Sequence, residues 1–146
     1  MALLSLFNPA GGFRYHLRAL RYPGSLWQPF RLALGEFLMS WQTSSKTLLI
    51  VGPSGGYCLP LLLFERFDRL ICLEPDPVAR LIFRRRLTHA PLRRHPQIEF
   101  IAKDYLLENP ERLVRLAESS GDAAILFSNV LGQLRCLLQI DSESDP

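Results

Sequence analysis

The sequence predicts an α/β protein built on a doubly wound parallel β-sheet of about four strands, with helices on both faces. Three observations predict it. Short apolar runs alternate along the chain with segments of helical periodicity. The runs are uninterrupted, as in 46–52, which is typical of strands buried on both faces. Each run ends at glycine or at a hydrogen-bonding side chain, where open parallel sheets bind their ligands.

The elements follow one another in strict alternation. A first helix is expected to begin with Pro29, where the missing N–H costs nothing, and it carries apolar residues at helical spacing up to Trp41. Strands are predicted over 46–52, 68–74, 97–102 and 122–128, and further helices over 59–66, 77–87, 110–119 and 131–140. This alternation makes residues 29–140 one domain, preceded by a basic irregular segment (1–28) and followed by a polar tail (141–146).

The composition is that of an ordinary globular domain, with 48% hydrophobic and 21% charged residues, which excludes a disordered chain. No apolar run approaches the ~18–20 residues that cross a bilayer, and the first residues lack the basic leader of a secretory signal. The three cysteines (Cys58, Cys72 and Cys136) are isolated, so neither a metal site nor a disulfide framework is expected. We therefore expect a cytoplasmic protein that does not associate with membranes.

Polar groups and glycines stand at the ends of all four predicted strands. The first strand ends at Gly52 and enters a turn, Pro53-Ser54-Gly55-Gly56, whose glycines allow a ligand to approach the backbone. The second strand ends at Glu74, 22 residues beyond Gly52, and its carboxylate can accept hydrogen bonds from both hydroxyls of a ribose. The third strand ends at Asp104, and the fourth at Ser128-Asn129.

The remaining candidates surround these acids. Asp104 can accept a hydrogen bond from an exocyclic amine such as that of adenine, and Pro75 and Tyr105 can wall the base. Each polar residue also has an ordinary structural use: Glu74 and Asn129 as helix caps, and Asp104 as a turn residue. Their joint placement at four strand ends favours a binding site.

Two nucleotide-binding motifs do not fit the glycine turn. The last three places of a P-loop need glycine, lysine and a hydroxyl residue, but here they hold Tyr57, Cys58 and Leu59. A dinucleotide fingerprint fails because its second and third glycines fall on Ser54 and Tyr57. The turn therefore lacks the groups that bind a triphosphate with its magnesium, and those that bind a pyrophosphate.

The remaining pattern resembles the class I S-adenosylmethionine-dependent methyltransferase family over residues 46–133. The matching segments are the glycine turn 52–56, Leu73-Glu74-Pro75-Asp76, Lys103-Asp104-Tyr105 and Ser128-Asn129. The resemblance implies a Rossmann-like cofactor-binding domain over 29–140, with S-adenosylmethionine as cofactor and an unknown methyl acceptor.

By the same resemblance, Gly52 and Gly56 contact the methionine part, Glu74 the ribose and Asp104 the adenine. The full set of expected cofactor contacts is Gly52, Ser54, Gly55, Gly56, Glu74, Pro75, Asp104, Tyr105 and Asn129. No catalytic residue is assigned, because methyl transfer from a sulfonium mainly requires alignment and exclusion of water. The chain departs from the family at Ile50, where an acid is common, and at Ser54, where a glycine is common.

Two other readings stay open. Members of the family have more strands than the four found here. We therefore expect the chain to be a truncated protein, a degenerate one or half of an assembly. The fourth strand would then be an exposed edge that can pair with another copy. A degenerate chain would be a non-catalytic interaction protein with the same fold. A weaker third reading is nucleic-acid binding. It rests on a basic cluster formed by Arg80, Arg84, Arg85, Arg86, Arg93 and Arg94.

Overall fold

The structure is a computed structural model that describes residues 17, 21 and 28–128. Its four strands are β1 (Thr47–Val51), β2 (Arg69–Leu73), β3 (Gln97–Ile101) and β4 (Ala123–Phe127). They form one sheet of order β3-β2-β1-β4, in which all three pairings are parallel. The helical segments are α3 (Gln28–Ser40), η1 (Leu61–Arg66), α4 (Pro77–Thr88), α5 (Tyr105–Glu108) and α6 (Pro110–Ser119). The predicted parallel α/β fold is therefore confirmed.

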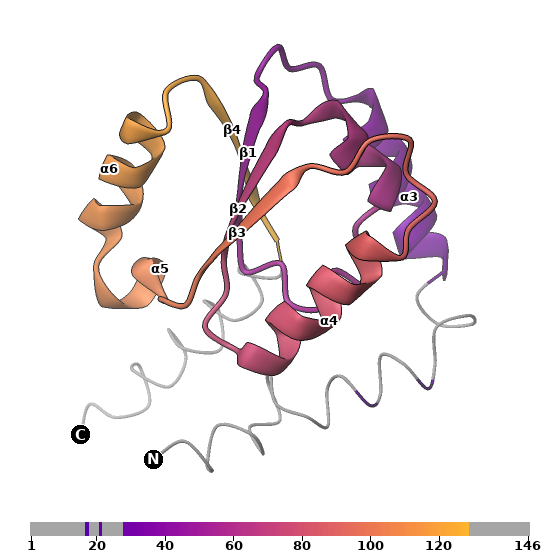
Figure 1. The fold of residues 1–146 in the computed structure, drawn as a ribbon, viewed down its shortest axis with the longest axis horizontal. Helices are drawn as coiled ribbons and strands as arrows, with labels where there is room; N and C mark the ends of the chain where they lie inside the picture. The colour runs from indigo at the N-terminus through magenta and orange to yellow at the C-terminus, as the bar shows by residue number, and fades with distance from the viewer. Residues whose placement is uncertain (1–16, 18–20, 22–27, 129–146) are drawn as a thin grey trace, which may run out of the picture.

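Helices cover both faces of the sheet (Figure 1). Leu48 and Ile50 of β1 pack in a core with residues of α3, η1 and α4, including Leu38, Phe64 and Phe83. The alternate residues of the same strand, Leu49 and Val51, pack on the other face in a core that includes Leu113 of α6. Because successive side chains of a strand point to opposite faces, two covered faces require an uninterrupted apolar strand.

Two of the loops that lead into helices use ordinary capping chemistry. Asp76 precedes α4, and its Oδ1 accepts a hydrogen bond from the N–H of Val78 at 2.8 Å, with Pro77 at the first helical position. Asn109 precedes α6 in the same way and accepts from the N–H of Arg112. Asp76, the last residue of the segment Leu73-Glu74-Pro75-Asp76 singled out from the sequence, therefore serves as a helix cap.

Some elements differ from the sequence-based expectation. The helix expected over 59–66 is a 3-10 helix that begins at Leu61, because Pro60 disfavours helical backbone at Leu59. The short helix α5 was not expected. Leu17 and Arg21, expected in irregular backbone, are helical, in keeping with the high helix propensity of leucine and arginine. The expected helix 131–140, the tail 141–146 and Asn129 lie outside the described residues.

One face of β4 is open in the part of the chain that the structure describes. The side chains of Ile125 and Phe127 are 39% and 51% exposed, whereas Ala124 on the opposite face is buried. β4 also lies at the edge of the sheet, as expected from the sequence. Pairing of this edge with a second copy stays a prediction. Within residues 17, 21 and 28–128, no helix combines the length and apolar character needed to cross a bilayer.

The glycines provide a test of the fold. Gly56 has φ +66°, and a Cβ at this position would meet the Phe83 ring at 2.4 Å. Gly56→Ala therefore combines left-handed strain with overpacking, and we expect it to lower the free energy of unfolding by about 2–4 kcal/mol in urea denaturation.

Two matched glycines separate these contributions. Gly35 lies inside α3 with open space around it, so Gly35→Ala is expected to stabilise the protein by about 0.5–1 kcal/mol. Gly121 has φ +69° and open space, so Gly121→Ala should show the cost of the backbone strain alone, about 1–2 kcal/mol. Equal losses at Gly56 and Gly121 would contradict the close packing of the bend on Phe83.

Candidate functional site

The carboxyl ends of the strands lie along one edge of the sheet. The parallel ladder continues one residue past three strands: the N–H of Gly52 donates to the carbonyl of Leu73 at 2.9 Å, that of Glu74 to Ile101 at 3.0 Å, and that of Ser128 to Val51 at 2.9 Å. These bonds place Gly52 and Glu74 next to each other at the tips of β1 and β2. The register of the sheet thus brings together two of the strand ends from which the site was predicted.

The glycine bend that follows β1 is a tight turn. The N–H of Gly56 donates to the carbonyl of Pro53 at 2.9 Å, which closes the turn over residues 53–56. Gly52 and Gly56 have φ of 66°, and Ser54 has φ of 51°. A non-glycine residue in the left-handed region costs about 1–2 kcal/mol, so other contacts must hold Ser54 there.

Glu74 supplies that contact. Its side chain is buried, at 7% exposure, and points to the bend: Oε2 accepts a hydrogen bond from the N–H of Ser54 at 2.7 Å. Its other oxygen, Oε1, accepts from the N–H of Asp76 at 3.1 Å. Both oxygens therefore bind main-chain donors, which the sequence did not suggest.

Arg86 holds the bend from the side of α4. Its Nη1 donates to the carbonyl of Gly55 at 2.8 Å, and its guanidinium lies 5.3 Å from the centre of the Tyr57 ring. Burial, and the charge of Arg31 nearby, lower the pKa of Arg86. The bend is thus held by an anion at the N–H of Ser54 and by a cation at the carbonyl of Gly55.

The two glycines of the bend also have packing reasons. A Cβ on Gly55 would meet the Tyr57 ring at 2.6 Å, and one on Gly56 would meet Phe83 of α4. The absence of side chains allows the bend to lie directly on these rings. The glycines therefore serve the fold whether or not a ligand approaches the backbone.

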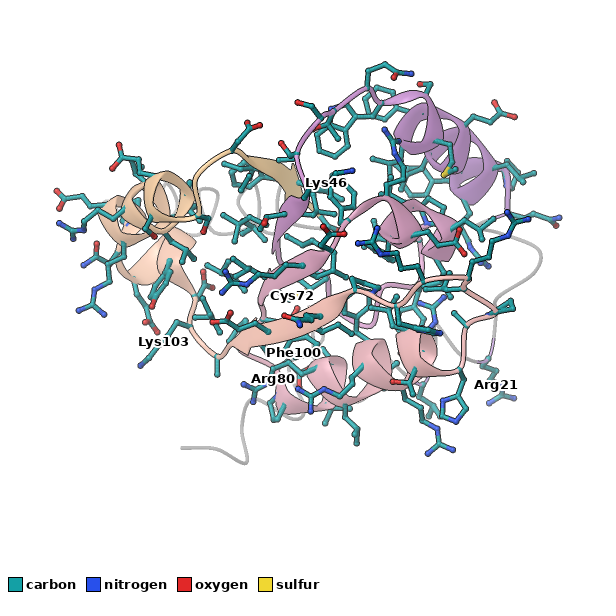
Figure 2. All side chains as sticks on the ribbon, turned by 45° about the horizontal axis from the view of Figure 1, so that its top comes forward. Arg21, Lys46, Cys72, Arg80, Phe100 and Lys103 are labelled. Atoms are coloured by element: carbon teal, nitrogen blue, oxygen red, sulfur yellow. The ribbon has the colours of Figure 1, made fainter. Side chains whose placement is uncertain are left out.

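The other predicted site residues lie in different surroundings. Pro75 is exposed beside Glu74, and Asp104 is half-buried just before α5. The ring of Tyr105 packs against the core that contains Leu73 and Leu113, so part of this side chain belongs to the fold. Lys103, which was not assigned, lies at the same end of β3, beside α5 (Figure 2). Asn129 lies outside the described residues, so the structure does not place it.

The basic cluster does not form a single free surface. The guanidinium of Arg84 lies 5.3 Å from the centre of the Phe100 ring, Arg86 binds the glycine bend, and Arg94 forms an ion pair with Asp68. Three of the six arginines therefore have intramolecular contacts that compete with phosphate. Nucleic-acid binding through this cluster stays a prediction.

Comparison with known proteins does not assign the chain to a family. No protein-family model matches the chain, and no curated protein matches it. The methyltransferase function expected from the sequence therefore stays a prediction.

The contact between Glu74 and the bend can be measured through stability. Glu74→Ala leaves the N–H groups of Ser54 and Asp76 without their acceptor, and we expect a loss of about 2–4 kcal/mol in the free energy of unfolding. Glu99→Ala is the matched control: it removes a half-exposed carboxylate that pairs with Arg69 at 2.5 Å, and its cost should stay below about 1 kcal/mol. Similar losses in both variants would refute the proposed role of Glu74 in holding the bend.

The two described cysteines should differ in reactivity. Burial raises the pKa of the Cys72 thiol, and the charge of Glu74 raises it further; Cys72 lies in β2 in the middle of the sheet (Figure 2). Burial also raises the pKa of Cys58, although Arg31 and Arg86 oppose the shift. Both thiols are therefore protonated at pH 7.

Maleimide labelling in a Cys136→Ser background tests this difference. We expect Cys58 to be labelled slowly, at a rate that increases as the pH rises, and Cys72 to be labelled only after unfolding. Labelling of Cys72 in the native protein would contradict its burial.

Proposed function

We propose that the chain is the cofactor-binding half of a class I S-adenosylmethionine-dependent methyltransferase, acting on an unknown methyl acceptor. One observation supports this most: the carboxylate of Glu74 lies at the tip of β2 directly beside the glycine bend that follows β1, with Oε2 2.7 Å from the nitrogen of Ser54. Ligands of open parallel sheets bind outside the carboxyl ends of the strands. An adenosine placed there has the backbone of the bend on one side and a carboxylate on the other.

The proposed contacts follow the strand order. Gly52 and Gly56 border the methionine part, and the carboxylate of Glu74 accepts from the ribose hydroxyls. Asp104, at the end of neighbouring β3, accepts from the adenine amine. The remaining proposed contacts are Ser54, Gly55, Pro75, Tyr105 and Asn129.

Methyl transfer mainly requires that the protein position the cofactor relative to the methyl acceptor. S-adenosylmethionine supplies a methyl group on a positively charged sulfur, which leaves as a neutral thioether. The bend and the two acids fix the position of the adenosine, and hence the direction in which the methyl group faces. No side chain of the described residues is assigned as a catalytic base.

A second candidate function is a non-catalytic scaffold for protein interaction. It is favoured by the structural uses that the site residues already have: both oxygens of Glu74 bind main-chain N–H groups, and Gly56 packs on Phe83. In this alternative, the contacts that hold the bend only stabilise the fold, and the chain binds no cofactor. The two functions differ in one measurable property, the affinity for S-adenosylmethionine.

Location and assembly belong to the same proposal. We place the protein in the cytoplasm because its cysteines are isolated and no metal or disulfide pattern is present in the sequence. The edge strand β4 is the proposed surface for pairing with a second copy, since its outer edge and one of its faces are open among the described residues.

Calorimetric titration with S-adenosylmethionine and S-adenosylhomocysteine tests the proposal. We expect binding of both, and about 10-fold weaker binding of the 2′-deoxy analogue of S-adenosylhomocysteine, because the analogue cannot donate one ribose hydrogen bond to Glu74. Changing the ligand in place of Glu74 avoids collapse of the bend. No heat at millimolar ligand would refute the cofactor site and support the scaffold.

A variant at the second acid locates the adenine. Asp104→Ala should weaken S-adenosylhomocysteine binding about 10-fold, because the amine of adenine loses a charged acceptor. Glu108→Gln, an exposed carboxyl in the neighbouring α5, is the matched control and should bind as the unmodified chain does. Equal affinities for all three proteins would remove Asp104 from the site.

A further inference from the structure

A groove lies between α3 and the turn that follows the glycine bend. Its volume is about 570 Å³, which is within the range of small-molecule sites. Leu32 on α3 and Leu59 and Pro60 in the turn form apolar walls. Gly35 lies between them, and a Cβ at Gly35 would have no atom within 4 Å, so nothing in the described part of the chain fills the space above it.

The polar end of the groove is cationic. Gln28 and Arg31 line it, and the described lining contains no acidic side chain. Leu32, the apolar neighbour of Arg31, is 60% exposed, so its side chain is accessible to a ligand in the groove. An apolar surface with an adjacent cation is complementary to an amphiphilic anion.

A second cation strengthens the positive field at this end. Arg31 lowers the pKa of both Arg86 and Cys58, so its charge acts on both groups, and Cys58 lines the groove. Arg86 is held in place by the carbonyl of Gly55 and by the ring of Tyr57, so its charge is fixed near Arg31. A guanidinium donates charge-assisted hydrogen bonds to carboxylates and phosphates, so Arg31 can bind an anionic group at this end of the groove.

We propose that this groove binds an organic anion that carries a carboxylate or a phosphate on an apolar body. The apolar body lies against Leu32, Leu59 and Pro60, and the anionic group lies at Arg31. The site is separate from the carboxyl edge between Glu74 and Asp104, and its occupation does not require S-adenosylmethionine. The proposal of an anion site is therefore independent of the proposed methyltransferase function.

Matched eight-carbon probes test the chemistry of the ligand. Calorimetric titration of the full chain, without cofactor, uses octanoate, octyl phosphate, octan-1-ol and octylamine. We expect octanoate or octyl phosphate to bind at least 10-fold more tightly than octanol, and octylamine to bind least. The stronger of the two anions identifies a carboxylate or a phosphate as the preferred group. Equal binding of octanoate, octyl phosphate and octanol, or no binding of either anion at millimolar concentration, would overturn the proposal.

Two variants locate the site. Gly35→Leu places a side chain in the groove and favours the helix, so the protein should keep its thermal stability and lose binding of the anions. Arg31→Gln should reduce the preference for octanoate over octanol, whereas Arg85→Gln, an exposed arginine of α4, should leave it unchanged. Unchanged anion binding by a folded Gly35→Leu chain would overturn the proposal.

A labelling experiment reads out the groove itself. In a Cys136→Ser background, saturating octanoate should slow maleimide labelling of Cys58 at least several-fold, since Cys58 lines the groove. Unchanged labelling of Cys58 under saturating octanoate would place the ligand elsewhere and overturn the proposal. Titration of Gly35→Leu with S-adenosylhomocysteine separates the two sites: retained binding shows that loss of the anion leaves the cofactor proposal intact.

Discussion

The carboxyl edge of this sheet depends on the hydrogen bond between the N–H of Ser54 and Oε2 of Glu74, 2.7 Å long and largely shielded from water. It joins the tip of β2 to the bend after β1 and stabilises Ser54 in left-handed backbone. Arg86 completes the arrangement by donating a hydrogen bond to the carbonyl of Gly55. Because one charge accepts and the other donates, the bend is fixed in position and in direction.

A bend held in this way is suited to binding because its main-chain groups are already in place before a ligand arrives. The same contacts are also sufficient to explain why the residues are present without any ligand. The two explanations differ in what the carboxylate of Glu74 accepts: main-chain N–H groups alone, or the ribose hydroxyls of the proposed cofactor as well.

The two faces of the sheet are covered to different extents among the described residues. α3, η1 and α4 bury one face, where Phe64, Phe83 and Phe100 meet edge to face. On the other face α6 covers β1 and β2, while Ile125 and Phe127 of β4 stay exposed. The groove beside Gly35 lies against α3, one of the helices on the well-packed face, and residues of α3 and of the turn line it.

The sequence by itself determined the parallel α/β fold, the strand positions and the neighbourhood of Glu74 and the glycine bend. These features follow from local signals, since uninterrupted apolar runs specify strands buried on both faces, and strand ends in a parallel sheet share an edge. Only the tertiary structure decided that the carboxylate of Glu74 binds the backbone of the bend and that Gly56 packs on Phe83. It also showed that Arg86 binds the bend, whereas the sequence had placed this arginine in a basic cluster. The sequence likewise gave no indication of the groove beside Gly35. These contacts join residues about 20–30 positions apart, and their geometry depends on how helices pack on the sheet, which residue spacing does not encode.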